Sequence, residues 1–194
     1  MTLALNPRQT ALVLIDLQQG IMAYPVAPHP TATVLRHALQ LGQACVATGA
    51  TVVCVNVGFA ADRADQLKQP VDAAPPIPPG GMPPGWSELV PEVAALPGSL
   101  HITKRQWGAF HVTDLDLQLR RRGITTIVLG GIATNFGVES TAREAWQHNY
   151  AVVIAEDACA SRTPEMHRFA IEMILPRLAR VRATAEIVAA LGAA

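Results

Sequence analysis

Three segments of the 194-residue chain place chemically useful groups where apolar runs end. Asp16 directly follows the apolar run 11–15, and a carboxylate in that place suits acid or base chemistry, because burial raises its pKa. The alternative is that Asp16 merely caps a turn. Lys104 follows the weaker run 101–103, and a third segment, 130–143, is rich in glycine.

Lys104 stands out because the chain contains thirteen arginines but only two lysines. Where arginine is the usual cation, a lysine at the end of a strand indicates a need for a compact, titratable ammonium group. The alternative is that Lys104 forms a solvated basic pair with Arg105.

The segment 130–143 joins a predicted strand to a predicted helix. Such a turn exposes backbone N–H groups at a helix N-terminus, where they suit an anion or an oxyanion. The spacing from Gly131 to Gly137 differs from that of a dinucleotide-binding motif, which we therefore reject. The same kind of turn carries the nucleophile in several hydrolases, yet its occupant here is Gly137.

The elements that must position these groups alternate between strands and helices. Short β-rich runs predict strands at 11–15, 51–57, 101–103, 124–129 and 151–155. Helices are predicted at 31–48 and 113–122, each followed by glycine, and from Thr163, which precedes Pro164 and apolar residues at 166, 169, 170, 173 and 174. This alternation predicts an α/β fold with three layers, α/β/α, and a mostly parallel sheet of about six strands. Ligands of such sheets bind beyond the carboxyl ends of the strands.

Length and composition predict one domain spanning residues 1–194. Residues 70–97 contain nine of the fifteen prolines, which predicts irregular structure and a lid or an oligomer contact, with a linker as the alternative. The net charge of zero disfavours a nucleic-acid or anionic-membrane partner. Three cysteines and the absence of a signal-like or membrane-spanning run favour a cytoplasmic protein.

In sequence order, these motifs resemble the isochorismatase-like hydrolase superfamily, also called cysteine hydrolases, which has a Rossmann-like fold and includes nicotinamidases. The resemblance begins near Thr10 and covers nearly the whole chain. ALVLIDLQQG resembles the motif that ends in the catalytic aspartate, ITKRQWGAFHVTDLDLQLRRRGI the lysine segment, and GGIATNFGVESTAREA the nucleophile turn. The resemblance implies catalytic roles for Asp16 and Lys104, a small-molecule substrate, and a homodimer or homotetramer.

Gly137 departs from most of this superfamily, which has a nucleophilic cysteine at that position. Glycine excludes a covalent thioester there. True isochorismatases also resemble the chain in having glycine, and in them an aspartate acts as general acid on a vinyl ether. Their turn reads Ala-His-x-Gly rather than the 134–137 sequence found here, which puts isochorismate in doubt as the substrate. The resemblance also implies backbone donors at Ala133 and Gly137, with a cis peptide bond between Ile132 and Ala133.

Other nucleophiles and a metal are not expected. Cys159, Cys45 and Cys54 suit a core better than a nucleophile, and Ser140 and Thr141 lie a turn too far into the helix. The zinc motif of nicotinamidases has no counterpart at residues 57–62. The six histidines show no ligand spacing, and we interpret each as solvated or buried in the core, at positions 29, 37, 101, 111, 148 and 167. We therefore predict no metal, and we also predict no cofactor.

Position along the chain suggests an aromatic, modestly polar pocket for a small planar or cyclic substrate. Its predicted lining residues are Phe59, Trp107, Phe110, Asn135 and Phe136. Core or dimer packing is the alternative for Trp107 and Phe110. The leading hypothesis is a hydrolase without a nucleophile, and the alternatives are a non-catalytic binding protein or an amidase that uses another residue.

Overall fold

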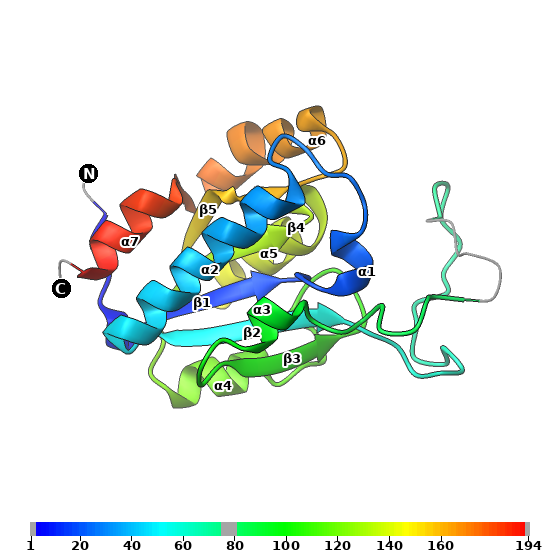
Figure 1. Ribbon diagram of the computed structural model, residues 1–194, viewed down its shortest axis with the longest axis horizontal. Coiled ribbons are helices and arrows are strands. Elements are labelled where there is room, and N and C mark those ends of the chain that lie inside the picture. The colour runs from blue at the N-terminus through cyan, green and yellow to red at the C-terminus, as the bar shows by residue number, and fades with distance from the viewer. Residues whose placement is uncertain (1–2, 75–80, 193–194) are drawn as a thin grey trace.

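The computed structural model describes residues 3–74 and 81–192 and has a six-stranded sheet at its centre (Figure 1). All neighbouring strands are parallel, in the order β3-β2-β1-β4-β5-β6, which confirms the predicted α/β fold. The strands are β1 (Thr10–Ile15), β2 (Thr51–Val57), β3 (Leu100–Lys104), β4 (Thr126–Ile132), β5 (Ala151–Ala160) and β6 (Arg180–Arg182).

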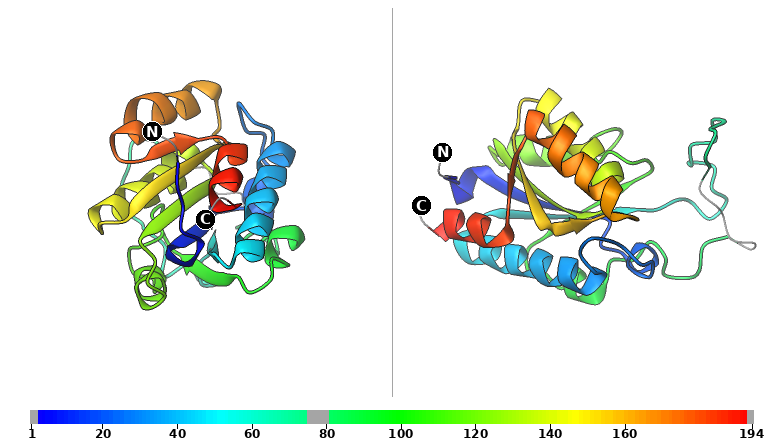
Figure 2. Two further views of the ribbon diagram at one scale, coloured as in Figure 1. Left: turned by 90° about the vertical axis from the view of Figure 1, so that its left-hand side faces the viewer. Right: turned by 90° about the horizontal axis from the view of Figure 1, so that it is seen from above.

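Helices cover both faces of the sheet, as Figure 2 shows. One face packs against α2, α3 and α7, and the other against α4, α5 and the helical turns that follow α6. The α-helices are α1 (Gln19–Met22), α2 (Thr31–Thr48), α3 (Pro91–Ala94), α4 (Leu115–Arg121), α5 (Glu139–Gln147), α6 (Pro164–Phe169) and α7 (Thr184–Gly192). Single turns of other helix types are η1 (Pro7–Gln9), η2 (Thr134–Val138), η3 (Ala170–Ile174) and η4 (Leu175–Arg177), of which η2 and η3 are π-helical.

Strand β1 shows why the sheet is buried on both sides. Every residue of this strand is buried, and its side chains alternate between the two cores. Leu12 and Leu14 pack on the face of α2, whereas Val13 and Ile15 pack on the face of α5. The continuous apolar run in the sequence is therefore the signature of a central parallel strand.

Local signals in the sequence fix several helix ends. Helix α2 ends before Gly49, whose φ of 78° lies in the left-handed region that glycine adopts readily. Helix α6 begins after Thr163, whose hydroxyl accepts a hydrogen bond from the backbone N–H of Met166 at 3.3 Å. These two ends agree with the sequence prediction.

The proline-rich segment 70–97 is irregular over much of its described part, but it contains the short helix α3, which the sequence analysis did not predict. Residues 75–80 lie outside the described part of the chain. The described flanks project from the edge of the sheet where β1, β2 and β3 end (Figures 1 and 2). A lid or oligomer contact therefore stays a prediction.

Gln18 links residues 86–89 of this proline-rich segment to the sheet by hydrogen bonds. Its buried side-chain amide donates to the carbonyls of Val57 and Trp86 at 3.1 and 3.0 Å, and its oxygen accepts from the Val57 N–H at 2.8 Å. The amide thus satisfies backbone groups on two segments at once. Its contacts hold residues 86–89 beside the carboxyl ends of the strands.

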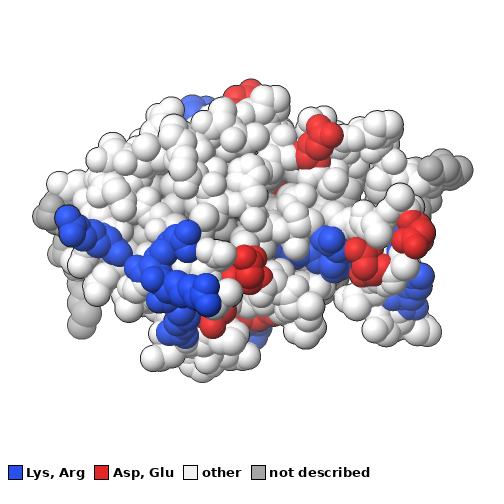
Figure 3. Space-filling model, turned by 90° about the horizontal axis from the view of Figure 1, so that it is seen from below, with Lys and Arg blue, Asp and Glu red and all other residues white. Residues whose placement is uncertain are grey.

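Charged side chains are sparse on the surface. Figure 3 shows one face on which most atoms belong to uncharged residues, with a cluster of basic side chains on the left and further basic and acidic side chains on the right. Within the described ranges, none of the helices has the length and apolar character that crossing a membrane requires.

Candidate functional site

A buried ion pair forms where β1 and β3 end. Lys104 Nζ donates a hydrogen bond to Asp16 Oδ2 at 2.7 Å and a second to the carbonyl of Gln106 at 3.1 Å. The two side chains are 2% and 7% exposed. Because β2 lies between β1 and β3, the long lysine side chain must reach across one strand to meet the carboxylate. The alternative of a solvated pair with Arg105 is therefore wrong.

Burial dominates the electrostatics of Asp16. Desolvation raises the pKa of this carboxyl to about 6, although the charge and hydrogen bond of Lys104 act in the opposite direction. Asp16 Oδ1 is buried and has no hydrogen-bond partner among the described residues. The residue also has a φ of 56°, an uncommon conformation that is concentrated at functional sites. The raised pKa and the positive φ both mark Asp16 as a candidate for proton transfer.

Gly137 lies directly against this pair. A Cβ added to it would sit 3.2 Å from Asp16 Oδ2, 2.8 Å from Ile15 Cγ2 and 3.6 Å from the carbonyl oxygen of Trp107. Gly137 is on the π-helical turn η2, which follows β4. The structure therefore brings together the three segments that the sequence analysis singled out.

We expect Gly137→Ala to destabilise the protein by about 1–3 kcal/mol, as overpacking of a filled site does. The added Cβ would lie 2.8 Å from a methyl group that the branched, buried side chain of Ile15 cannot easily move. Urea unfolding measures the loss. Gly192→Ala is the matched control, since a Cβ added there has no atom within 4 Å among the described residues beyond its own helix and chain neighbours. Equal stability of Gly137→Ala and wild type would show that this space accepts a side chain.

Helix α5 holds the loop that follows Lys104. Thr141 Oγ1 accepts a hydrogen bond from the Ala109 N–H at 3.2 Å and donates one to the Gly137 carbonyl at 2.7 Å. The carboxylate of Glu144 accepts from the Phe110 N–H at 3.1 Å. Thr141 therefore links the loop to η2, and both hydrogen bonds of its hydroxyl serve this structural role.

The backbone around the turn has the features that the resemblance implies. The peptide bond between Ile132 and Ala133 is cis. The Ala133 carbonyl accepts hydrogen bonds from the N–H groups of Phe136 and Val138, both at 3.2 Å, which closes the π turn. The role of Ala133 and Gly137 as oxyanion donors stays a prediction.

Three of the five predicted lining residues, all of them aromatic, follow the strands whose ends carry the site. Trp107 is 62% exposed, and its ring contacts that of Phe136 with centroids 4.8 Å apart. Phe59 is half-buried after β2, and the guanidinium carbon of Arg63 lies 5.6 Å from its ring centroid. An aromatic pair of one exposed and one half-buried ring next to a buried acid is suited to hold a planar ligand.

The other two predicted lining residues have structural partners. Phe110 is buried in the core, where it stacks on His148 with centroids 5.2 Å apart and packs against Tyr150. This placement corrects its assignment to the pocket and favours the alternative of core packing. Asn135 accepts a hydrogen bond from the hydroxyl of Ser161, which anchors η2 to the end of β5.

The three cysteines are buried and free, as expected for core residues. Burial raises the pKa of the Cys159 thiol to about 12 and that of Cys54 to about 11. Such thiols are almost entirely protonated at neutral pH and are poor nucleophiles.

A histidine cluster escaped the sequence analysis. His29 and His167, which were interpreted as solvated or core residues, both contact Glu156. The three residues come from a loop, from α6 and from β5, so their spacing along the sequence gives no sign of the contact. Within the described residues these are the three side chains that could together ligate a metal ion.

Comparisons with known proteins show what the whole chain is similar to. Residues 10–186 match the isochorismatase domain. The chain is 51% identical over 189 residues to the uncharacterized isochorismatase family protein YecD of Escherichia coli O157:H7, covering 97% of this chain and 100% of that protein. The structure of an isochorismatase family protein from Burkholderia thailandensis superposes with a TM-score of 0.91 and 46% identity, covering 97% of this chain and 98% of that one.

A partial match concerns a protein with a stated activity. The ureidoacrylate amidohydrolase RutB of Methylobacterium radiotolerans is 40% identical over 87 residues, which are 44% of this chain and 34% of that protein.

Proposed function

The chain belongs to the isochorismatase family, and from this premise we propose that it hydrolyses a small cyclic or planar substrate by acid–base chemistry at Asp16. Lys104 acts as the electrostatic partner of Asp16, and no cysteine nucleophile takes part. The observation that carries the proposal is the buried carboxyl of Asp16 beside Gly137, which has a pKa of about 6 and one oxygen, Oδ1, without a hydrogen-bond partner among the described residues.

A raised pKa suits a general acid. At neutral pH an ordinary aspartic acid is almost fully ionised, whereas a pKa of about 6 leaves about a tenth of Asp16 protonated. Lys104 keeps the conjugate carboxylate from being an isolated buried charge after the proton has left. The pair is therefore able to cycle between protonated and ionised forms without leaving its buried position.

The chemistry best matched to this arrangement is hydrolysis of an enol ether. Protonated Asp16 transfers its proton to the terminal carbon of the C=C bond, and the neighbouring ether oxygen shares the resulting positive charge. Water adds to the cationic carbon and returns a proton to the Asp16 carboxylate. The resulting hemiketal collapses, breaking the C–O bond to give a ketone and an alcohol. No step needs a side chain at position 137.

The backbone and aromatic groups supply binding. We propose that Trp107 and Phe136 stack on the planar part of the substrate, with Phe59 and Asn135 at its edge. The N–H groups of Ala133 and Gly137 donate to a developing negative charge or to a substrate oxygen.

The wild-type protein acts as a homodimer or homotetramer, and the exposed apolar side chains of Met166, Phe169 and Met173 support such an assembly.

A second candidate is a binding protein without catalysis, which the tight ion pair at 2.7 Å also favours. In such a protein Asp16 and Lys104 would serve as a structural pair. An amidase of the nicotinamidase type would instead need another nucleophile. Buried thiols with raised pKa values argue against that alternative.

Turnover against a panel of substrates tests the proposal. The panel contains isochorismate, small cyclic enol ethers, nicotinamide and a ureido amide, each followed with the wild-type protein. We expect hydrolysis of an enol ether with a kcat/KM that is constant below about pH 6 and falls about tenfold per pH unit above it, because only protonated Asp16 donates.

Each contrary outcome points to a different function. Binding of an enol ether without turnover would support the binding protein. Turnover of an amide through an acyl-enzyme detected by mass spectrometry would support an amidase. A kcat/KM that rises through pH 6 would make Asp16 a general base instead of an acid.

A further inference from the structure

Three residues from distant parts of the chain converge beside the turn η2. His29 lies in the loop before α2, Glu156 on β5, and His167 on α6. The Nε2 atoms of His29 and His167 lie 2.8 and 3.1 Å from the same oxygen, Glu156 Oε1. The two rings meet edge to face with centroids 5.6 Å apart. The donor atoms of all three residues lie within 4.8 Å of one another.

We propose that His29, Glu156 and His167 bind one divalent transition-metal ion, with Zn²⁺ as the probe. Two imidazole nitrogens and one carboxylate form a ligand set that binds Zn²⁺ well, and solvent supplies the fourth position of a tetrahedral site. Mg²⁺ and Ca²⁺ prefer sites built from oxygen, so the two histidines disfavour them. The proposal of a metal site does not depend on the proposed chemistry at Asp16.

The outer hydrogen-bond partner of His167 fits metal binding. The Nδ1 of His167 lies 2.8 Å from the hydroxyl of Thr134, which is buried. When Nδ1–H donates to this hydroxyl, the lone pair of Nε2 faces the site. Such an outer partner fixes the orientation and tautomer of metal-binding histidines.

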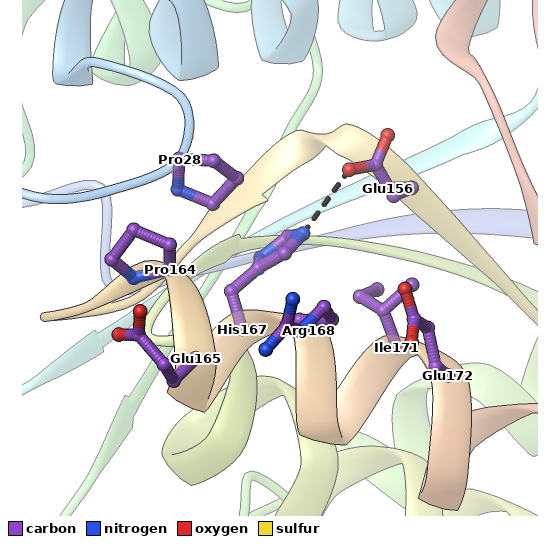
Figure 4. Close-up of a pocket in the computed structure, with 8 residues that line it drawn as sticks. All are labelled: Pro28, Glu156, Pro164, Glu165, His167, Arg168, Ile171 and Glu172. Atoms are coloured by element: carbon purple, nitrogen blue, oxygen red, sulfur yellow. Dashed lines mark hydrogen bonds and ion pairs between the residues drawn. The ribbon is translucent and has the colours of Figure 1, made fainter.

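A shallow cleft of about 300 Å³ gives a metal ion access to the cluster. Figure 4 shows His167 reaching from α6 toward Glu156 on β5, with Pro28 and Pro164 on the other side of the cleft. The cleft is lined by three carboxylates and one guanidinium group, from Glu156, Glu165, Glu172 and Arg168. This excess of negative charge attracts a cation.

The site is joined to the turn that carries Gly137. Thr134, the hydrogen-bond partner of His167, is the first residue of η2. A metal ion held by a loop, β5 and α6 would therefore lock the start of this turn in place. Thr134→Val should weaken Zn²⁺ binding about 10–100-fold, as other changes to outer partners do, without changing the stoichiometry.

Equilibrium dialysis of the untagged, chelator-treated full-length protein against ZnCl₂ tests the proposal, with bound metal measured by mass spectrometry. We expect one Zn²⁺ per chain in the wild type. His29→Gln and Glu156→Gln should each weaken binding by about 100-fold or more, since losing a ligand exceeds losing its outer partner. Both altered side chains are partly exposed, and each substitution keeps a polar group of similar size.

His37→Gln is the matched control. His37 is also half-buried and lies 3.4 Å from a carboxylate of β5, that of Asp157, but no second histidine accompanies it. This variant should bind Zn²⁺ as the wild type does. The proposal is overturned if the wild type binds no stoichiometric Zn²⁺. It is equally overturned if His29→Gln and Glu156→Gln bind as tightly as His37→Gln.

Discussion

Asp16→Asn is expected to lower turnover of the enol ether about 10²–10⁴-fold while the fold persists, because a general acid contributes a factor of that size. Asparagine has nearly the same shape as aspartate but carries no titratable proton. It also tolerates the positive φ of 56° at this position, which alanine would not. The comparison of kcat with KM separates catalysis from binding, since the loss should fall on kcat.

The stability of the same variant reports on the raised pKa. In the wild type, folded Asp16 binds its proton more tightly than unfolded Asp16 does, so its contribution to stability is full below about pH 4 and is lost as the pH rises through about 6. The loss across this window is about 3 kcal/mol, from a shift of about two pH units. Asp16→Asn should lack this part of the pH dependence in urea unfolding.

Asp116→Asn is the control for loss of a carboxylate. Asp116 forms an exposed ion pair with Arg120 within α4, so its replacement should change neither turnover nor the pH dependence between pH 4 and 6. If Asp16→Asn turned over the substrate as fast as Asp116→Asn does, the assignment of Asp16 would be wrong.

The sequence predicted the central strands, and the places of Asp16 and Lys104 at strand ends, because their signals are local. The five apolar residues before Asp16 predict a strand, the burial of that strand on both faces, and the position of the Asp16 carboxylate at its end. Strand β6 was missed, because its three half-buried residues, Arg180–Arg182, carry two charges and show no apolar run. The sixth strand emerges only when the chain folds back beside β5.

The helix after Thr163 shows where periodicity misleads. Apolar residues recur there at helical spacing, which predicts a buried apolar face. In the structure Met166, Phe169 and Met173 are 40%, 59% and 52% exposed, whereas His167 and Ala170 point inward. A π turn over Ala170–Ile174 also changes the spacing after α6. Neither the inward histidine nor its partner Glu156 could be inferred from spacing, because tertiary packing selects them.

Lys104→Met is expected to destabilise the protein by about 3–5 kcal/mol at pH 8, because it leaves the Asp16 carboxylate buried without its counter-charge. Methionine has similar length and no charge, so the loss reflects electrostatics more than volume. Removing the ammonium group also removes the two influences that lower the pKa of Asp16, which should then rise above 6. Unfolding in urea at several pH values measures both effects.

The sign of the pH dependence makes this prediction specific. In Lys104→Met the stability lost on ionising Asp16 continues to grow above pH 6, up to the new, higher pKa of the folded state. The deficit relative to wild type should therefore be smaller at pH 5 than at pH 8. The descending limb of kcat/KM should move to higher pH by the same shift, because protonated Asp16 persists further.

The double variant Asp16→Asn/Lys104→Met shows whether the stability lost in Lys104→Met comes from the Asp16 charge or from other contacts of Lys104. With both charges gone, the buried site no longer holds an uncompensated ion, so at pH 8 the double variant should be more stable than Lys104→Met alone. If the two substitutions added independently, or if the deficit of Lys104→Met were equal at pH 5 and pH 8, Lys104 would not act through the Asp16 charge. A recovered stability would instead show that the deficit of Lys104→Met comes from the ionised Asp16 carboxylate, the form that the proposed proton transfer leaves behind and that Lys104 stabilises.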